Sequence, residues 1–243
     1  MDEKEILKER FKSAITSAVK AISEDFNLDI QFGSSITSKK NSLNLPEVVN
    51  LQKLQDFTNL RAFADSEALK IKYTNKDIYI ENEPKGSKAK ALYNIAEKIR
   101  YEKLGSDKLK GINNNITKCY QNKFKDKKIA EIKTEADVPI TEAFELYLRS
   151  HFFKIKPNHV TKKVLSYWKE LFDKNLKNNL KELQENIRDQ RKYGQLISNI
   201  IEDLNFEDSD SNEKEEKKEN ESEESSQSDN NTNENAMSED KEE

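Results

Sequence analysis

Residues 11–33 read FKSAITSAVKAISEDFNLDIQFG, and the spacing of the apolar side chains changes within this stretch. In the first half they recur every three or four positions, which predicts a helix that ends near Ser23. Together with Leu7, which precedes the stretch, the residues of this stripe are Phe11, Ala14, Ile15, Ala18, Val19 and Ile22. In residues 28–32 apolar and polar side chains alternate, which is typical of a half-buried strand, and Gly33 closes it. The stretch therefore predicts a helix followed directly by a strand.

Two later segments show the same alternation of apolar and polar side chains. They are residues 68–73 and 77–81, and Thr74-Asn75-Lys76 is a plausible turn between them. An isolated hairpin would be marginally stable, so we expect a small sheet of two or three strands that packs on the first helix. The predicted fold class is mainly α, with a small antiparallel β-sheet of two or three strands near the N-terminal third.

The other segments of the body are predicted to be helical or irregular. Residues 34–45 are polar and show no period, so we expect a loop there, and Pro46 is expected to open a short helix that runs to about Phe57. From Ser87 onward the apolar residues again recur at helical spacing. The expected boundaries are a helix from Ser87 to Gly105, one from about Ser106 to Tyr120, one starting near Asp137 and Pro139, one starting at Pro157-Asn158, and a helical region over 175–204 with a break near Tyr193-Gly194.

Charge divides the chain at about residue 206. Residues 207–243 carry 16 acidic and 4 basic side chains, whereas residues 1–206 carry 30 acidic and 38 basic ones. The last 37 residues contain only Ala236 and Met237 as apolar side chains, so they cannot bury enough surface to offset the entropy of ordering. We therefore predict a helical body over 1–206 and a disordered, acidic, low-complexity linker or tail over 207–243.

Composition argues against several classes of protein. No apolar run approaches the roughly 18 residues that a membrane-spanning helix needs, and none follows Met1, so we expect no membrane segment and no targeting signal. Cys119 is the one cysteine, which rules out an internal disulfide framework and suits a reducing compartment. We expect a cytoplasmic protein.

The chain offers few residues for catalysis or metal binding. Its five glycines form no phosphate-binding loop, and its single cysteine cannot provide a cysteine pair for zinc. The two histidines, His151 and His159, could bind a metal together. However, His151 lies on a predicted apolar helix face and His159 at a predicted helix start, and both are ordinary structural positions for histidine. Cys119 has no histidine close to it in sequence, and a small core residue is the simpler interpretation. We predict no catalytic, cofactor-binding or metal-binding residue.

Three further features of the sequence could indicate a function, but for each we favour another interpretation. Asp208-Ser209-Asp210-Ser211 resembles the magnesium loop of von Willebrand A domains, but Asp210 stands where that loop needs serine, and no apolar strand precedes it. The lysines of residues 1–206 are dispersed among glutamates without interleaved aromatic residues, so we expect no nucleic-acid binding. Trp168 lies in the most aromatic stretch, residues 166–172, which is either a partner-binding surface or, as we favour, a core anchor.

The order of the segments resembles the N-terminal region of the CobT subunit of the aerobic-type, ATP-dependent cobaltochelatase. The resemblance runs through most of residues 6–206, and the acidic stretch that follows is similar to that family's linker. None of the matching segments is a catalytic motif, so the specificity lies in their order and spacing. They are FKSAITSAVKAISEDFNLDIQFG (11–33), RAFADSEALKIKY (61–73), YNIAEKIRYEKLGSDKLKGINNNI (93–116), LYLRS (146–150), SYWKELF (166–172) and DQRKYGQLISNIIEDLNF (189–206).

This resemblance implies a function in cobalamin biosynthesis, in a complex that inserts cobalt into a corrin ring with ATP hydrolysis. In such a complex a CobN-like large subunit binds the corrin and cobalt, an AAA+ CobS-like subunit hydrolyses ATP, and CobT-like subunits act as adaptors between the two. The complex uses ATP, magnesium and cobalt, none of which we expect this chain to bind. The family's von Willebrand A domain, with its magnesium site, follows the linker, so no site residue carries over, and we expect either a fragment or a shortened member.

Two other functions stay open on the sequence. The chain could be a stand-alone helical protein-binding module whose basic body engages an acidic partner, its own tail included. It could also be the partner of an AAA+ ATPase in another metal-insertion or remodelling task.

Overall fold

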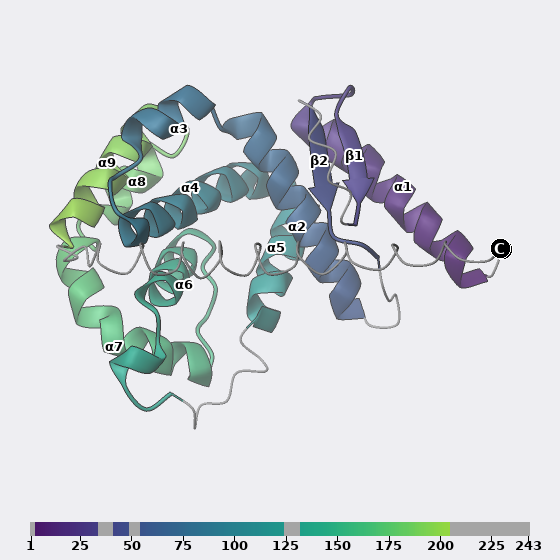
Figure 1. The fold of residues 1–243 in the computed structure, drawn as a ribbon. Helices are drawn as coiled ribbons and strands as arrows, with labels where there is room; N and C mark the ends of the chain where they lie inside the picture. Colours follow the sequence, from purple (N-terminus) through teal and green to yellow (C-terminus); the bar gives the residue numbers. More distant parts are fainter. Residues whose placement is uncertain (1–2, 34–40, 49–53, 124–131, 205–243) are drawn as a thin grey trace, which may run out of the picture. The chain divides into compact units, whose positions relative to one another are not determined.

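The computed structural model describes residues 3–33, 41–48, 54–123 and 132–204, which are mainly helical (Figure 1). The helices are α1 (Glu3–Ser23), α2 (Leu54–Tyr73), α3 (Lys76–Asn82), α4 (Ser87–Lys108), α5 (Lys110–Lys123), α6 (Ile140–Phe152), α7 (His159–Asn175), α8 (Leu180–Glu185) and α9 (Gln190–Asp203), with a 3₁₀ turn at Glu135–Asp137. The strands are β1 (Asp29–Phe32) and β2 (Ser42–Leu45). The mainly α fold class with a small sheet is confirmed. The predicted tail at 207–243 lies outside the described residues.

The sheet confirms one predicted strand and corrects the pairing. β1 coincides with the predicted strand at 28–32, but its partner is β2, and the two strands run parallel, with Ile30 beside Leu43. The prediction of an antiparallel sheet was therefore wrong. β2 lies within residues 34–45, where we expected a loop. Its short sequence, SLNL, does alternate, since Leu43 and Leu45 are buried, but four residues are too few to stand out from a polar segment.

Residues 68–73 and 77–81, predicted as strands, are helical. The first segment is the end of α2, where Ala64, Ala68 and Leu69 are buried on one helical stripe, so the helical period of the whole element outweighs a short alternation. The second segment is most of α3. The Asn75 side chain caps that helix, since its oxygen accepts the backbone N–H groups of Asp77 and Ile78 at 2.9 and 3.2 Å.

Two glycines predicted to end or break helices lie inside them. A Cβ built at Gly105 would lie 2.2 Å from Cδ2 of Leu69, so this glycine lets α4 and α2 approach closely. A Cβ at Gly194, inside α9, would lie 2.8 Å from Oη of Tyr93. The break in the last helical region falls instead between α8 and α9, where Asp189 caps α9 by accepting the backbone N–H of Lys192.

Pro46 does not open a helix, because α2 begins only at Leu54. The boundary at Pro157-Asn158 was predicted correctly, since α7 starts at His159 and the Asn158 side chain accepts the backbone N–H of Thr161 at 2.9 Å. Proline just before this cap suits the helix start.

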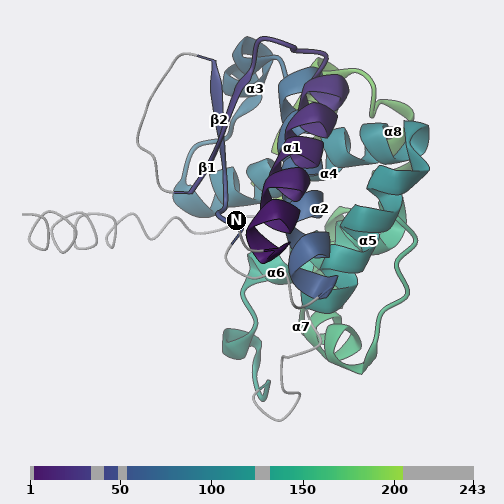
Figure 2. The ribbon, with the colours of Figure 1, turned by 90° about the vertical axis from the view of Figure 1, so that its right-hand side faces the viewer.

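The buried side chains form two clusters. One comes mainly from α4 and from α6 to α9, and the other from α1, both strands, α2 and α5. α2 packs against α1, α4 and α5, and Figure 2 shows α1 in front of α2 with the strands beside it. Trp168 packs on the first cluster, and its Nε1 donates to the backbone oxygen of Val138 at 3.0 Å. Trp168 is half-buried, and these contacts favour the interpretation as a core anchor.

Candidate functional site

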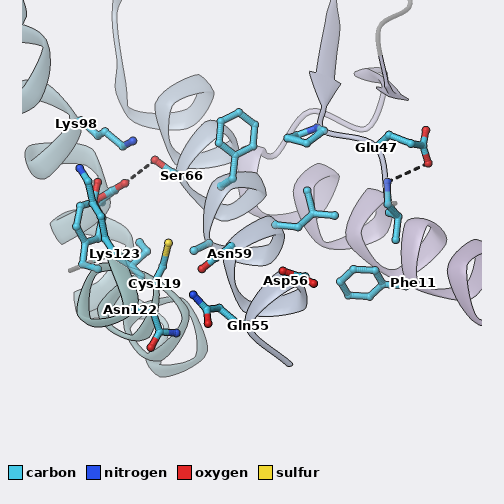
Figure 3. A pocket seen from close by; sticks show the side chains of 18 residues that line it. Phe11, Glu47, Gln55, Asp56, Asn59, Ser66, Lys98, Cys119, Asn122 and Lys123 are labelled. Atoms are coloured by element: carbon cyan, nitrogen blue, oxygen red, sulfur yellow. Dashed lines mark hydrogen bonds between the residues drawn. The ribbon is translucent and has the colours of Figure 1, made fainter. Parts of the chain in front are cut away.

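A pocket of about 720 Å³ opens along one face of α2 (Figure 3), and we call it the α2 trough. Its floor is formed by α2 side chains within residues 55–66, a length of about 16 Å at the helical rise. One wall consists of Phe11 of α1 and residues 46–48, which follow β2. The opposite wall consists of Lys98 and Glu102 of α4 with α5 side chains within residues 116–123. The trough is thus assembled from five separate segments of the chain.

The trough combines an apolar body with polar groups. Phe63 lies on its floor with 40% of its surface exposed, which is unusual for a phenylalanine. Phe11 packs edge-on against Phe57, with ring centroids 4.7 Å apart. Figure 3 shows the amide side chains of Gln55, Asn59 and Asn122 close to Cys119. Apolar surface with a few polar groups is the usual composition of a binding site.

A buried ion network supports the wall formed by α4 and α5. The Arg149 side chain, from α6, is only 1% exposed, and its Nη2 lies 2.8 Å from Oε2 of Glu102. Its Nε donates to Oε1 of Glu145 at 3.1 Å, and its Cζ lies 3.3 Å from the ring centroid of Tyr120. A charged group that is buried away from water needs partners of opposite charge, which Glu102 and Glu145 provide. The Tyr120 ring lies against the guanidinium and limits its orientation.

The same network reaches the floor and the rim of the trough. Ser66 of α2 donates from Oγ to Oε1 of Glu102 at 2.6 Å, and Lys123 of α5 lies 2.8 Å from Oε2 of Glu145. The contacts therefore join α2, α4, α5 and α6 behind the trough. We conclude that this wall is held in place by polar contacts as well as by packing.

Burial sets the protonation of the reactive side chains in the trough. It raises the pKa of the Cys119 thiol and, strongly, that of the Tyr120 hydroxyl, so both groups are neutral at pH 7. Burial alone would also raise the pKa of Glu145, but the positive charges of Arg149 and Lys123 outweigh it and lower the pKa to about 2. Because the thiolate is the nucleophilic form, Cys119 is not activated for attack.

The two histidines do not come together in a metal site. His151 lies on α6, with its ring edge-on to Phe152, and His159 is exposed at the start of α7. Over the ranges 3–33, 41–48, 54–123 and 132–204, no group of three His, Cys, Asp or Glu side chains could hold a metal ion. We therefore assign no step to a metal on this chain. The prediction that it has no catalytic, cofactor-binding or metal-binding residue stays a prediction.

Sequence reasoning located Cys119 only as a small core residue and missed the trough around it. Cys119 is half-buried and lines the trough instead. In the sequence, the signal for a surface site was Phe63, because this large apolar residue lies outside the stripe of Ala64, Ala68 and Leu69 that α2 buries. None of the helices in the described ranges has the length and apolar character that spanning a membrane requires.

A family model described as cobalamin biosynthesis protein CobT matches residues 6–243. No solved structure matches the chain. The family match covers nearly the whole sequence, including every segment on which the resemblance to CobT was based. It confirms that resemblance, and with it a role in cobalamin biosynthesis. The chain belongs to the CobT family.

Proposed function

We propose that this chain is a coupling subunit of an ATP-dependent cobaltochelatase complex in the cytoplasm. In this role it binds an AAA+ CobS-like ATPase subunit and a CobN-like large subunit and links one to the other. Cobalt is the substrate of the complex, and the partner subunits provide the sites for ATP, magnesium and the corrin ring. Family membership supports a place in such a complex, and the α2 trough supports the coupling role.

The trough is suited to binding another protein. Exposed aromatic side chains in a partly enclosed groove are typical of the residues that dominate binding energy at interfaces. Phe63 has this position on the floor, and Phe11 lies on one wall. The network around Arg149 holds the opposite wall, so little conformational freedom has to be lost when a partner binds.

The chemistry of the trough also favours binding over bond formation. Cys119 and Tyr120 are neutral at pH 7, and Glu102 and Glu145 pair with Arg149. Cys119 and Tyr120 thus lack the deprotonated form that attacks as a nucleophile, and the two carboxylates that pair with Arg149 are not free to act as general bases. The proposed contribution of the chain is therefore to bring partners together.

Co-purification tests this function. The tagged chain is mixed with the AAA+ subunit and the large subunit of the same organism, with ATP and magnesium present. We expect it to retain both subunits, and we expect the chain alone to show neither ATP hydrolysis nor cobalt insertion. Failure to retain either subunit would contradict the proposal, as would ATP hydrolysis by the chain alone.

A further inference from the structure

We propose that the α2 trough receives an amphipathic helix of a partner subunit, with an acidic side chain that pairs with Lys98 and a basic side chain that pairs with Asp56. The inference rests on the proposed function, because it assumes that the trough is the contact with a partner. It adds the secondary structure and the charge pattern of the segment that binds.

The shape of the trough favours a helix over an extended segment. The floor is a single helix over about 16 Å, and α1 and α5 provide the walls, so a helix of about eleven residues fits the length. An extended peptide binds by adding to a free strand edge, where it finds backbone partners. Apart from residues 46–48 and the end turns of α2 and α5, the residues that line the trough lie in helix interiors, whose backbone groups are already bonded within each helix.

The apolar surface provides anchor positions for such a helix. Phe63 lies exposed on the floor and Phe11 on the wall, while Leu60 and Ile116 add apolar surface between the walls. A helix that binds in a groove presents apolar side chains at spacings of three and four residues, which form one stripe. The proposed segment therefore carries such a stripe toward α2.

Two charges of the trough remain for the partner. Within the described part of the chain, neither Lys98 nor Asp56 forms an ion pair, whereas Glu47 lies 2.8 Å from Lys12 and Lys123 lies 2.8 Å from Glu145. Figure 3 shows Lys98 beside Ser66 and Asp56 beside Phe11, toward opposite ends of the trough. The rise along α2 from residue 56 to residue 66, the residue beside Lys98, is about 15 Å, and this sets the approximate spacing of the two charges along the trough. Opposite charges on the partner at these two points would fix its register.

Binding measurements with matched variants test the site. The affinity for the AAA+ subunit and for the large subunit is measured for Phe63→Ser, Lys98→Glu and Asp56→Lys. Their controls are Ile80→Ser, Lys118→Glu and Glu170→Lys, which change exposed residues outside the trough in the same way. We expect Phe63→Ser to weaken binding to one subunit about 10- to 100-fold and each charge reversal to weaken it about tenfold. We expect the controls to change affinity by less than about twofold.

Zero-length carbodiimide cross-linking tests the shape and charge of the bound segment. Lys98 should join to an Asp or Glu, and Asp56 to a Lys, of one partner segment. Because the two sites are about 15 Å apart, the partner residues should be about ten positions apart in a helix but only four or five in an extended chain. A separation of about ten residues supports the proposal, and one of four or five contradicts it.

The outcomes separate this inference from the proposed function. If the unaltered chain binds both subunits and the trough variants behave like their controls, the inference is wrong and the coupling function stands. If the unaltered chain binds neither subunit, both are wrong. Circular dichroism of each variant confirms that the helices are retained.

Discussion

Gly105→Ala tests the close packing of α4 on α2, which places both the floor and one wall of the trough. The added Cβ would lie 2.2 Å from Cδ2, 2.6 Å from Cδ1 and 2.9 Å from Cγ of Leu69. Leu69 is only 1% exposed within the cluster formed by α1, α2 and α5, so its side chain cannot turn into solvent. Relief of the overlap therefore requires Leu69 to change its rotamer within the filled core or α2 and α4 to move apart.

Two opposing effects set the size of the change. Overpacking of a filled core costs about 1–3 kcal/mol, and three carbon atoms closer than 3.0 Å place this site near the upper limit. Alanine in a helix interior is favoured over glycine by about 1 kcal/mol. We therefore expect Gly105→Ala to lower the free energy of unfolding by about 2 kcal/mol.

Urea unfolding followed by circular dichroism measures this change. Gly111→Ala is the matched control, because Gly111 also lies in a helix and no atom lies within 4 Å of its added Cβ. We expect the control to leave stability unchanged or to raise it by up to about 1 kcal/mol. In the double variant Leu69→Ala/Gly105→Ala, the loss should be smaller than the sum of the two single losses. Equal stability of Gly105→Ala and Gly111→Ala would refute the close approach of the two helices.

Three further predictions concern the α4–α5 side of the trough and its buried groups. Arg149→Met should lower the free energy of unfolding by about 3–5 kcal/mol, because Glu102 and Glu145 would stay buried without the guanidinium. Urea unfolding measures this change. A loss below about 1 kcal/mol would show that the network is dispensable for stability. The lowered pKa of Glu145, about 2 in the folded chain, stabilises the fold above about pH 4.5; as the pH falls toward 2 this contribution, about 3 kcal/mol, is lost. Urea midpoints measured over that range should fall less steeply for Glu145→Gln than for the unaltered chain, and parallel curves would count against the assignment. Cys119 should react with iodoacetamide more slowly than a free thiol at neutral pH, because burial raises its pKa. Labelling as fast as that of a free thiol would contradict this assignment.

Long amphipathic patterns predicted the helices well. The stripe in residues 11–22 predicted α1, where Ile15, Val19 and Ile22 are buried. The start of α7 was also visible, because Asn158 follows proline and caps the helix. These signals are local, since one face of a long helix or one capping side chain determines the outcome without distant contacts.

Short alternating segments and single glycines led to wrong predictions, because contacts with distant residues decide their structure. Residues 68–73 alternate, yet they continue a helix whose buried stripe is set by its contacts with α1, α4 and α5. Gly105 looks like a helix end in the sequence, but it is required by Leu69, which is 36 positions away. Only tertiary contacts distinguish these cases from strands and caps.

The trough was not predictable from the sequence because its parts are separated along the chain. Arg149 pairs with Glu102 across 47 positions, and Phe11 shares the trough with Tyr120. Neither pairing follows a local period. The one local signal, Phe63 outside the buried stripe of α2, does not show which other segments surround it.

Hydrogen–deuterium exchange of the chain, alone and bound to the AAA+ or the large subunit with ATP and magnesium, tests the central claim most directly. Our account predicts slower backbone exchange on binding in residues 55–66 and 116–123, which form the floor and one wall of the α2 trough. Complexes with both subunits in which these residues exchange as fast as in the free chain would contradict it.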